Sequence, residues 1–267
     1  MSGPHSSPRL GSPVADLLLD HPASGVVRVT LNRPEVRNAI SLPLQRELDA
    51  VLAEVAEDDA ARSVIVTGAG SDAFSAGYDL TELAAMSPDE TTAAMLEREE
   101  LLWRYLTFPK PIVAAVAGAA HGAGNIVAAA SDLRVGGPST RFTMSSARYG
   151  GANLTWLLDG LVGAGTARDL LMTSRTVDGT EALRIGLLSR YAEDGDVARL
   201  ALDAATELAA QPPEGLREIK ALLLDGPGRD LRTRYDRENT VARTTLRPRP
   251  ITDLFSGFFT RPGRTAR

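Results

Sequence analysis

Two short loops built from small residues are the sequence features best suited to chemistry. The first runs from Phe74 to Leu80 (FSAGYDL), and the second runs from Gly118 to Asn125 (GAAHGAGN). Side chains this small leave backbone N–H groups uncovered, and uncovered amides can bind an anion or an oxygen that gains negative charge. Each loop follows a segment that predicts a buried strand. The pair therefore indicates a site at the ends of strands.

Composition excludes several other chemistries. The chain has no cysteine, which rules out disulfides, thiolate nucleophiles and cysteine zinc sites. Its 3 histidines, His5, His21 and His121, are far apart in sequence, so we assign no metal. Lys plus Arg is 29 against 34 Asp plus Glu, a net charge of -5. With no overall field to attract a phosphate backbone, we expect no nucleic-acid partner.

Length and hydropathy indicate a soluble folded protein. The chain has 267 residues, of which 43% are hydrophobic and 24% are charged, enough for a sizeable core. Residues 1–13 lack the apolar centre of a secretory signal. The longest apolar stretch, residues 111–130, is mostly Ala and Gly and is typical of a buried segment rather than a membrane span. We therefore expect a cytoplasmic protein without a membrane partner.

The elements that would position the loops alternate along the chain. Ser41 and Ser87 are suited to cap the first two helices. This repeated order of strand, loop and helix, with buried strands, predicts an α/β layered fold. We expect strands over residues 26–31, 63–67, 112–116 and 132–135, and helices over residues 41–55, 87–106 and 125–130.

The chain becomes helical toward its C-terminal end. Helices are predicted over 197–211, 213–224 and 229–246, and the composition shifts near residue 195. We accordingly predict three regions: a disordered tail over residues 1–13, a core over 14–195 and a helical C-terminal region over 196–267.

The two loops belong to a longer series of motifs. In order, these are Asn32–Ala39 (NRPEVRNA), Phe74–Leu80, Phe108–Val116 (FPKPIVAAV), Gly118–Asp132, Arg141–Phe142 and Arg175–Leu187 (RTVDGTEALRIGL). Together they resemble the crotonase superfamily, the enoyl-CoA hydratase/isomerase family, over roughly residues 14–262. The resemblance implies a ββα spiral core with a helical C-terminal region. In that family this region packs the chains into homotrimers, often paired into hexamers.

The resemblance also implies a site for an acyl-CoA or acyl-carrier thioester. The thioester oxygen would lie between the backbone N–H groups of Tyr78 and Ala123, and Ala76 is assigned to CoA binding. Arg37 and Arg261 are candidates for holding the CoA phosphates, although both could equally be solvated surface arginines. Coenzyme A is part of the substrate, so no separate cofactor is expected.

The chain departs from the family's hydratases at two positions. Those enzymes carry two glutamates that handle water and a proton, and the corresponding residues are Ile126 and Ser146. Neither side chain can act as a general acid or base in this pH range, so hydration by the two-glutamate route is disfavoured. The remaining candidates for moving a proton are Tyr78, His121 and Tyr149.

An oxyanion hole without paired carboxylates suits decarboxylation of a malonyl-type thioester, because departing carbon dioxide leaves its electrons as the enolate and no base is needed. Pro138–Ser145 and Phe74–Gly77 are similar to the methylmalonyl-CoA decarboxylase branch of the family. We therefore expect a lyase or isomerase that works by decarboxylation or isomerisation. The alternatives are a hydratase with a displaced acid, a hydrolase of a thioester or β-diketone, and a non-catalytic acyl-CoA binding protein.

Overall fold

The chain divides into two units, residues 1–211 and 212–267. The computed structural model describes residues 15–246 and residue 250, so the predicted tail 1–13 lies outside the described residues. The division falls between Gln211 and Pro212 rather than at the predicted boundary between 195 and 196. The reason is that helix α8 (Val197–Ala209) packs on the sheet of the first unit and is part of its core.

Two sheets in the first unit confirm the predicted α/β class. The larger sheet has six strands in the order β1-β2-β3-β5-β7-β10, and the smaller has four in the order β4-β6-β8-β9. Among the strands that the structure describes, only the β1–β2 and β8–β9 pairs are antiparallel. The larger sheet consists of β1 (Leu17–Ala23), β2 (Val26–Leu31), β3 (Ser63–Gly68), β5 (Ile112–Val116), β7 (Leu133–Gly136) and β10 (Arg190–Tyr191), and the smaller of β4 (Ala73–Ser75), β6 (Ala119–His121), β8 (Arg141–Thr143) and β9 (Thr176–Asp178).

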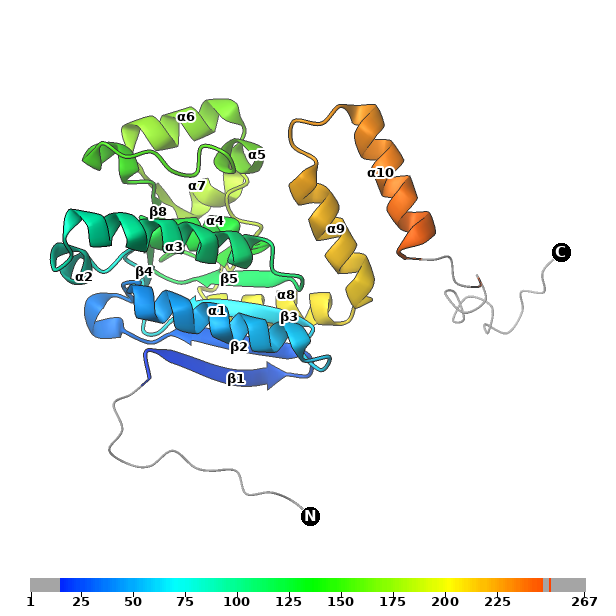
Figure 1. Cartoon of the computed structure of the whole chain (residues 1–267). Helices are drawn as coiled ribbons and strands as arrows, with labels where there is room; N and C mark the ends of the chain where they lie inside the picture. The colour runs from blue at the N-terminus through cyan, green and yellow to red at the C-terminus, as the bar shows by residue number, and fades with distance from the viewer. Residues whose placement is uncertain (1–14, 247–249, 251–267) are drawn as a thin grey trace, which may run out of the picture. The chain divides into compact units, whose positions relative to one another are not determined.

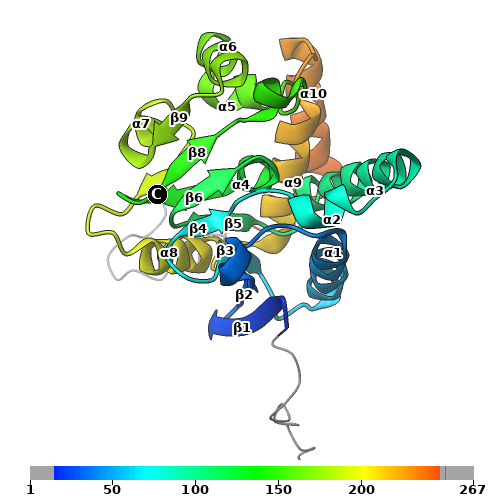
Figure 2. The ribbon, with the colours of Figure 1, turned by 90° about the vertical axis from the view of Figure 1, so that its left-hand side faces the viewer.

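Along the middle of the chain, successive strands alternate between the two sheets. Strands β3, β5 and β7 lie in the larger sheet, and β4, β6 and β8, which follow them, lie side by side in the smaller one (Figure 2). Parallel neighbours need crossover connections, and helices supply them. The helices of this unit before α8 are α1 (Leu42–Glu57), α2 (Leu80–Ala84), α3 (Pro88–Leu106), α4 (Ala123–Ala130), α5 (Leu158–Val162), α6 (Ala164–Thr173) and α7 (Gly179–Arg184), with 3-10 turns η1 (Pro34–Val36) and η2 (Ser146–Tyr149) (Figure 1).

The central strands are buried on both faces, as their unbroken apolar sequences predict. In β3, Val64 and Val66 belong to the main core, which also includes the apolar side of α1, whereas Ile65 belongs to a second core beneath α8. Helix α8 contributes small residues there, including Ala201 and Ala205. Because side chains alternate between the faces of a strand, each face needs its own covering layer.

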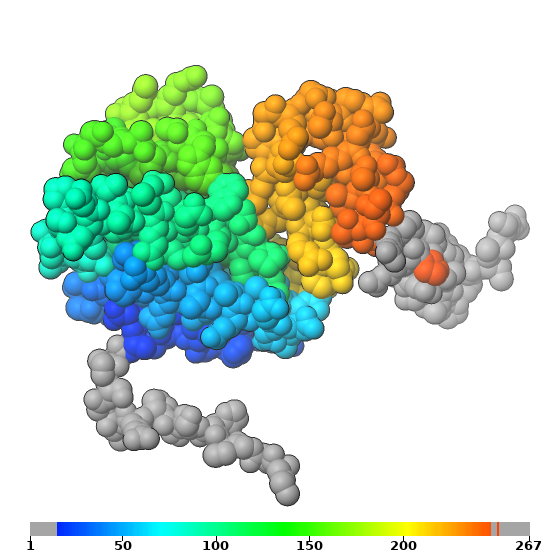
Figure 3. Space-filling model, viewed as in Figure 1, coloured from blue at the N-terminus to red at the C-terminus, as the bar shows by residue number. Residues whose placement is uncertain are grey.

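Helices α1 and α3 begin where their capping residues predict. The Ser41 hydroxyl accepts a hydrogen bond from the Leu44 amide at 3.2 Å. Ser87 and Glu90 form a reciprocal capping box, with distances of 2.8 and 3.3 Å. The two helices pack against each other, and Figure 3 shows them side by side on one face of the first unit.

The second unit contains helices α9 (Pro213–Asp225) and α10 (Leu231–Thr244), which confirms the predicted helical character. Within the described residues, neither helix buries a side chain, and large apolar side chains such as Leu223 and Tyr235 are exposed. None of the described helices is both long enough and apolar enough to cross a membrane.

Candidate active site

The two small-residue loops lie next to each other at the ends of neighbouring strands. Strands β4 and β6 pair in parallel, with Ser75 opposite Ala120, so the chain leaves both strands at the same edge of the sheet. Residues 76–78 follow β4. Gly122 follows β6, and α4 then begins at Ala123.

Gly77 allows the first loop to pass directly against the second. Its φ is +106°, and a Cβ atom there would lie 3.0 Å from the His121 carbonyl oxygen and 3.2 Å from the Ala123 nitrogen. Glycine accepts this conformation and this approach, whereas a residue with a side chain would be strained. The Gly77 carbonyl also accepts a hydrogen bond from the Ile40 amide at 2.7 Å, which holds the loop in place.

Several amides of these loops have no acceptor in the described chain, among them those of Tyr78 and Ala123. In the part of the chain that the structure describes, neither the Tyr78 N–H nor the Ala123 N–H donates a hydrogen bond, although the neighbouring Asp79 amide donates to the Ile40 carbonyl at 3.1 Å. Ala123 is the first residue of α4, so its amide carries the partial positive charge of a helix N-terminus. Because no acceptor within the described chain engages them, these two amides are available for an acceptor outside the chain.

A small apolar hollow of about 210 Å³ opens beside both residues. No acidic side chain is among the described residues that line it, and Ile126, only 9% exposed, contributes methyl groups there. The lining consists of Ile40, Gln45, Tyr78, Leu102, Ala123, Ile126 and Val127.

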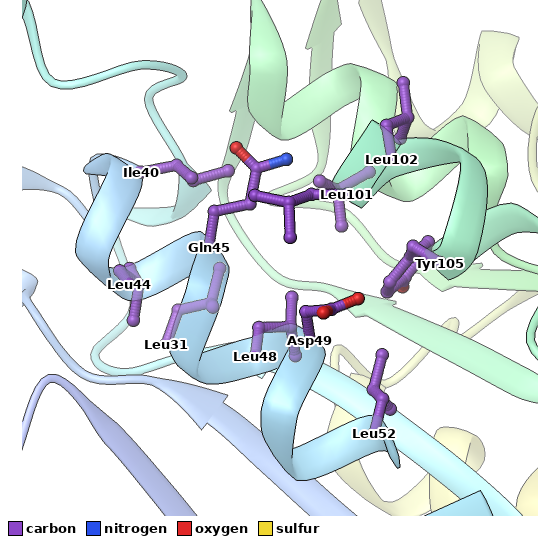
Figure 4. Close-up of a pocket in the computed structure, with 11 residues that line it drawn as sticks. Leu31, Ile40, Leu44, Gln45, Leu48, Asp49, Leu52, Leu101, Leu102 and Tyr105 are labelled. Carbon is purple, nitrogen blue, oxygen red and sulfur yellow. The ribbon is translucent and has the colours of Figure 1, made fainter. Parts of the chain in front are cut away.

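A larger apolar hollow of about 450 Å³ adjoins the first, between α1 and α3. Figure 4 shows leucines of α1, including Leu48 and Leu52, facing Leu101 and Tyr105 of α3. The two hollows share the lining residues Ile40, Gln45, Leu102 and Val127. The two hollows therefore lie side by side, and the larger of them extends between the two helices.

The Tyr78 ring packs against a buried cation. The Arg98 guanidinium lies 4.4 Å from the ring centroid, and this residue is 1% exposed. Its Nη2 donates to Glu82 at 2.6 Å and its Nη1 donates to the Gln45 Oε1 at 3.0 Å. Burial raises the pKa of the Tyr78 phenol, although the Arg98 cation opposes the rise. The phenol is therefore protonated at neutral pH and can donate a proton.

His121 is half-buried next to two cations. Burial lowers the pKa of its imidazole, and the Arg148 and Arg37 cations lower it further, so the ring is neutral at pH 7. The Arg37 side chain is exposed, while its carbonyl accepts the Ala76 amide at 2.9 Å. The structure thus brings Arg37, Ala76 and His121 to the same edge as the free amides.

Two other positions that the sequence singled out do not line either hollow. Tyr149 is 84% exposed and lines neither hollow, because η2 turns its side chain outward. Ser146 is half-buried in η2 and lines neither hollow. Arg261 lies outside the described residues. Among the residues that the structure describes, no three His, Asp or Glu side chains are grouped so that they could hold a metal ion.

Sequence reasoning missed Gln45, Glu82 and Arg98. A signal existed for Gln45, because it lies three residues before Leu48 on the apolar stripe of α1, where a polar side chain must find a buried partner. Arg98 gave no such signal, since it lies in the charged run Glu97–Glu100, which is typical of a solvated helix face.

Comparisons with known proteins identify the family of the chain. The family described as "Enoyl-CoA hydratase/isomerase" matches residues 21–249. The chain is 32% identical to the short-chain-enoyl-CoA hydratase of Clostridium acetobutylicum over 211 residues, 78% of this chain and 81% of that protein. It is 30% identical to the 1,2-epoxyphenylacetyl-CoA isomerase of Escherichia coli over 250 residues, 91% of this chain and 95% of that protein.

A solved structure of an enoyl-CoA hydratase is also similar to this chain. The crystal structure of enoyl-CoA hydratase from Bacillus anthracis matches with a TM-score of 0.86 and 28% identity, over 92% of this chain and 96% of that chain. The motifs, the paired sheets and these matches together confirm the expected fold. The chain belongs to the enoyl-CoA hydratase/isomerase family of crotonase-like α/β enzymes, which act on acyl-CoA.

Proposed function

We propose that this enzyme binds an acyl-CoA or acyl-carrier thioester with its carbonyl oxygen between the amides of Tyr78 and Ala123, and that these amides stabilise an enolate. The observation that carries the proposal is the pair of unpaired amides on two adjacent loops beside an apolar hollow. Enolate formation concentrates negative charge on the thioester oxygen. Each preorganised donor aimed at such an oxygen lowers the barrier by about 3 to 4 kcal/mol.

We further propose decarboxylation or isomerisation in preference to hydration by paired glutamates. The side chain beside the hollow at position 126 is isoleucine, and Ser146 stands at the other position where the family's hydratases have an acid. Neither can move a proton to or from water in the way a glutamate does. The reaction must therefore rely mainly on the Tyr78 and Ala123 amides, which stabilise the negative charge of the enolate.

Decarboxylation requires the fewest catalytic side chains of the reactions considered. The bond between the α-carbon and the substrate carboxylate breaks, and its electron pair forms the enolate while carbon dioxide leaves. One proton added to the α-carbon then gives the product. The described residues that line the smaller hollow include no carboxylate that would repel the substrate's own, and the likeness of Pro138–Ser145 to methylmalonyl-CoA decarboxylases supports the same choice.

Tyr78 is the best-supported proton donor of the three candidates. Tyr78 lines the same hollow as Ala123, and its raised pKa keeps the phenol protonated. His121 is neutral at pH 7 and is therefore better suited to accept a proton, which isomerisation would require. The exposure of Tyr149 argues against it. For the coenzyme, we propose contacts from Ala76 and Arg37 and, from beyond the described residues, Arg261.

A panel of acyl-CoA thioesters tests the proposal. Purified protein is incubated with malonyl-, methylmalonyl-, 2-enoyl- and 3-enoyl-CoA, and products are identified by mass spectrometry and NMR. We expect loss of carbon dioxide from a malonyl-type substrate or a shift of a double bond. Hydration of 2-enoyl-CoA as the main reaction would contradict the preference stated above.

The same panel separates the alternatives. A hydrolase would release free CoA thiol, which a thiol reagent detects. A non-catalytic binder would raise its melting temperature with acyl-CoA and leave every substrate unchanged. Either outcome would overturn the proposed lyase or isomerase chemistry.

We also propose that the protein assembles into homotrimers or hexamers. The apolar side chains left exposed on α9 and α10, among them Ile219, Leu223 and Tyr235, support a contact with other subunits. Light scattering after size-exclusion chromatography should give a trimer or hexamer mass, and a monomer at micromolar concentration would refute it.

A further inference from the structure

The two hollows adjoin at a set of shared lining residues, called the neck here, which includes a single polar side chain. Four residues line both hollows: Ile40, Gln45, Leu102 and Val127. Three of these are aliphatic, and Gln45 is the one polar side chain that the described linings of the two hollows share. Figure 4 shows its amide at the end of the larger hollow opposite Leu52, between Ile40 and Leu101. An acyl chain that extends from the smaller hollow into the larger one would therefore lie close to this amide.

Hydrogen bonds to Arg98 fix the orientation of the Gln45 amide. The Arg98 Nη1 donates to Oε1 at 3.0 Å, and the Gln45 Nε2 donates to the Arg98 carbonyl at 3.2 Å. Arginine has only donors, so the atom that faces its guanidinium must be the oxygen of the amide. Both bonds join α1 to α3 at the neck.

These bonds leave one donor of Gln45 unused. A primary amide has two N–H groups, and the described residues provide an acceptor for only one of them. Gln45 is 8% exposed, so the second N–H has little access to water and has aliphatic neighbours in the neck. An unused donor in such surroundings is unfavourable, and an acceptor on a bound ligand would remove that penalty.

We infer that Gln45 is a specificity-determining residue and that the enzyme prefers acyl groups carrying an oxygen acceptor, such as a keto, hydroxyl or ether oxygen, beyond the β-carbon. This inference rests on the proposed function, which places the thioester carbonyl at Tyr78 and Ala123 and the α- and β-carbons in the smaller hollow. The next atoms of the chain reach the neck and Gln45. The remainder of the acyl group is apolar and occupies the larger hollow between α1 and α3.

A merely structural role for Gln45 predicts something different. If the amide serves only to hold Arg98 and thereby join α1 to α3, its replacement lowers stability but affects oxygenated and plain acyl groups equally. Discrimination between the two ligands is therefore the readout that separates the alternatives.

The test uses unreactive acyl-CoA analogues in which a methylene replaces the thioester sulfur. Calorimetry compares an unsubstituted octanoyl analogue with analogues that carry a keto oxygen at carbon 4, 5 or 6. We expect at least one keto analogue to bind the wild-type protein about 3- to 10-fold more tightly, which is the net worth of one hydrogen bond. In Gln45→Leu this preference should disappear or reverse.

Two further variants keep the comparison interpretable. Gln45→Met preserves the length of the side chain without a donor and should also lose the preference, even if Gln45→Leu folds poorly. Glu54→Gln, on the exposed side of the same helix, should keep it. Equal binding of all analogues to the wild type, or a preference that survives in Gln45→Met, would overturn the inference. If no analogue binds more tightly than CoA alone, the proposed function fails together with it.

Discussion

Replacing Gly77 with alanine should disable the site while leaving most of the fold intact. The new Cβ would lie 3.0 Å from the His121 carbonyl oxygen and 3.2 Å from the Ala123 nitrogen, so one loop must move away from the other. A φ of +106° adds backbone strain of about 1 to 3 kcal/mol for a residue with a side chain. Loss of alignment of even one amide donor corresponds to a fall in kcat of about 100- to 1000-fold.

The matched control is Gly195→Ala. Gly195 also has a positive φ, +81°, but nothing lies within 4 Å of a Cβ built there, so this variant should lose only the stability that backbone strain costs, less than Gly77→Ala loses, with unchanged kcat. Stability is measured by urea unfolding, and kcat is measured on whichever substrate the acyl-CoA panel identifies. If Gly77→Ala retained wild-type kcat, the amides of the two loops could not be the catalytic donors.

Three further variants test separate parts of the account. Tyr78→Phe keeps the backbone amide but removes the phenol, so kcat should fall about 100-fold with little change in KM, as expected for loss of a general acid; an unchanged kcat would exclude the phenol as the donor. In His121→Gln, unfolding free energy should depend less on pH. The pKa of His121 is lowered in the folded state, so the wild-type protein loses stability as pH falls from about 6.5 toward the folded pKa. Identical pH dependence of the unfolding free energy in the two proteins, measured by urea unfolding, would contradict this. Asn38→Ala removes hydrogen bonds of 2.8, 3.0 and 3.1 Å between a fully buried side-chain amide and the backbone. The free energy of unfolding, measured in urea, should fall by about 2 to 4 kcal/mol. A decrease below about 0.5 kcal/mol would show that these bonds contribute little.

Local signals were sufficient for much of the fold. The capping box of Ser87 and Glu90 marks the start of α3, and the small side chains around Gly77 and Gly122 mark the two loops. The three-residue strands β4, β6 and β8 were not predicted, because three residues are too few to show a periodicity. They form only because neighbouring strands of the smaller sheet supply their hydrogen bonds.

Long-range packing explains what the sequence left open. Helix α8 has an apolar side, but the sequence does not say what covers it, and the predicted boundary at 195/196 therefore separated it from the sheet that it covers. Arg98 lies between glutamates in the chain, yet the fold places it under Tyr78 with Glu82 and Gln45 as partners. Tyr149 lies close in sequence to Ser146, one of the two positions at which the family's hydratases have an acid, yet the turn at η2 exposes it.

A crystal structure with an unreactive acyl-CoA analogue that retains the carbonyl tests the central claim most directly. We expect the carbonyl oxygen to lie about 2.7 to 3.1 Å from both the Tyr78 and the Ala123 nitrogens. An oxygen that contacts only one of these amides, or a ligand whose carbonyl binds elsewhere, would contradict the account.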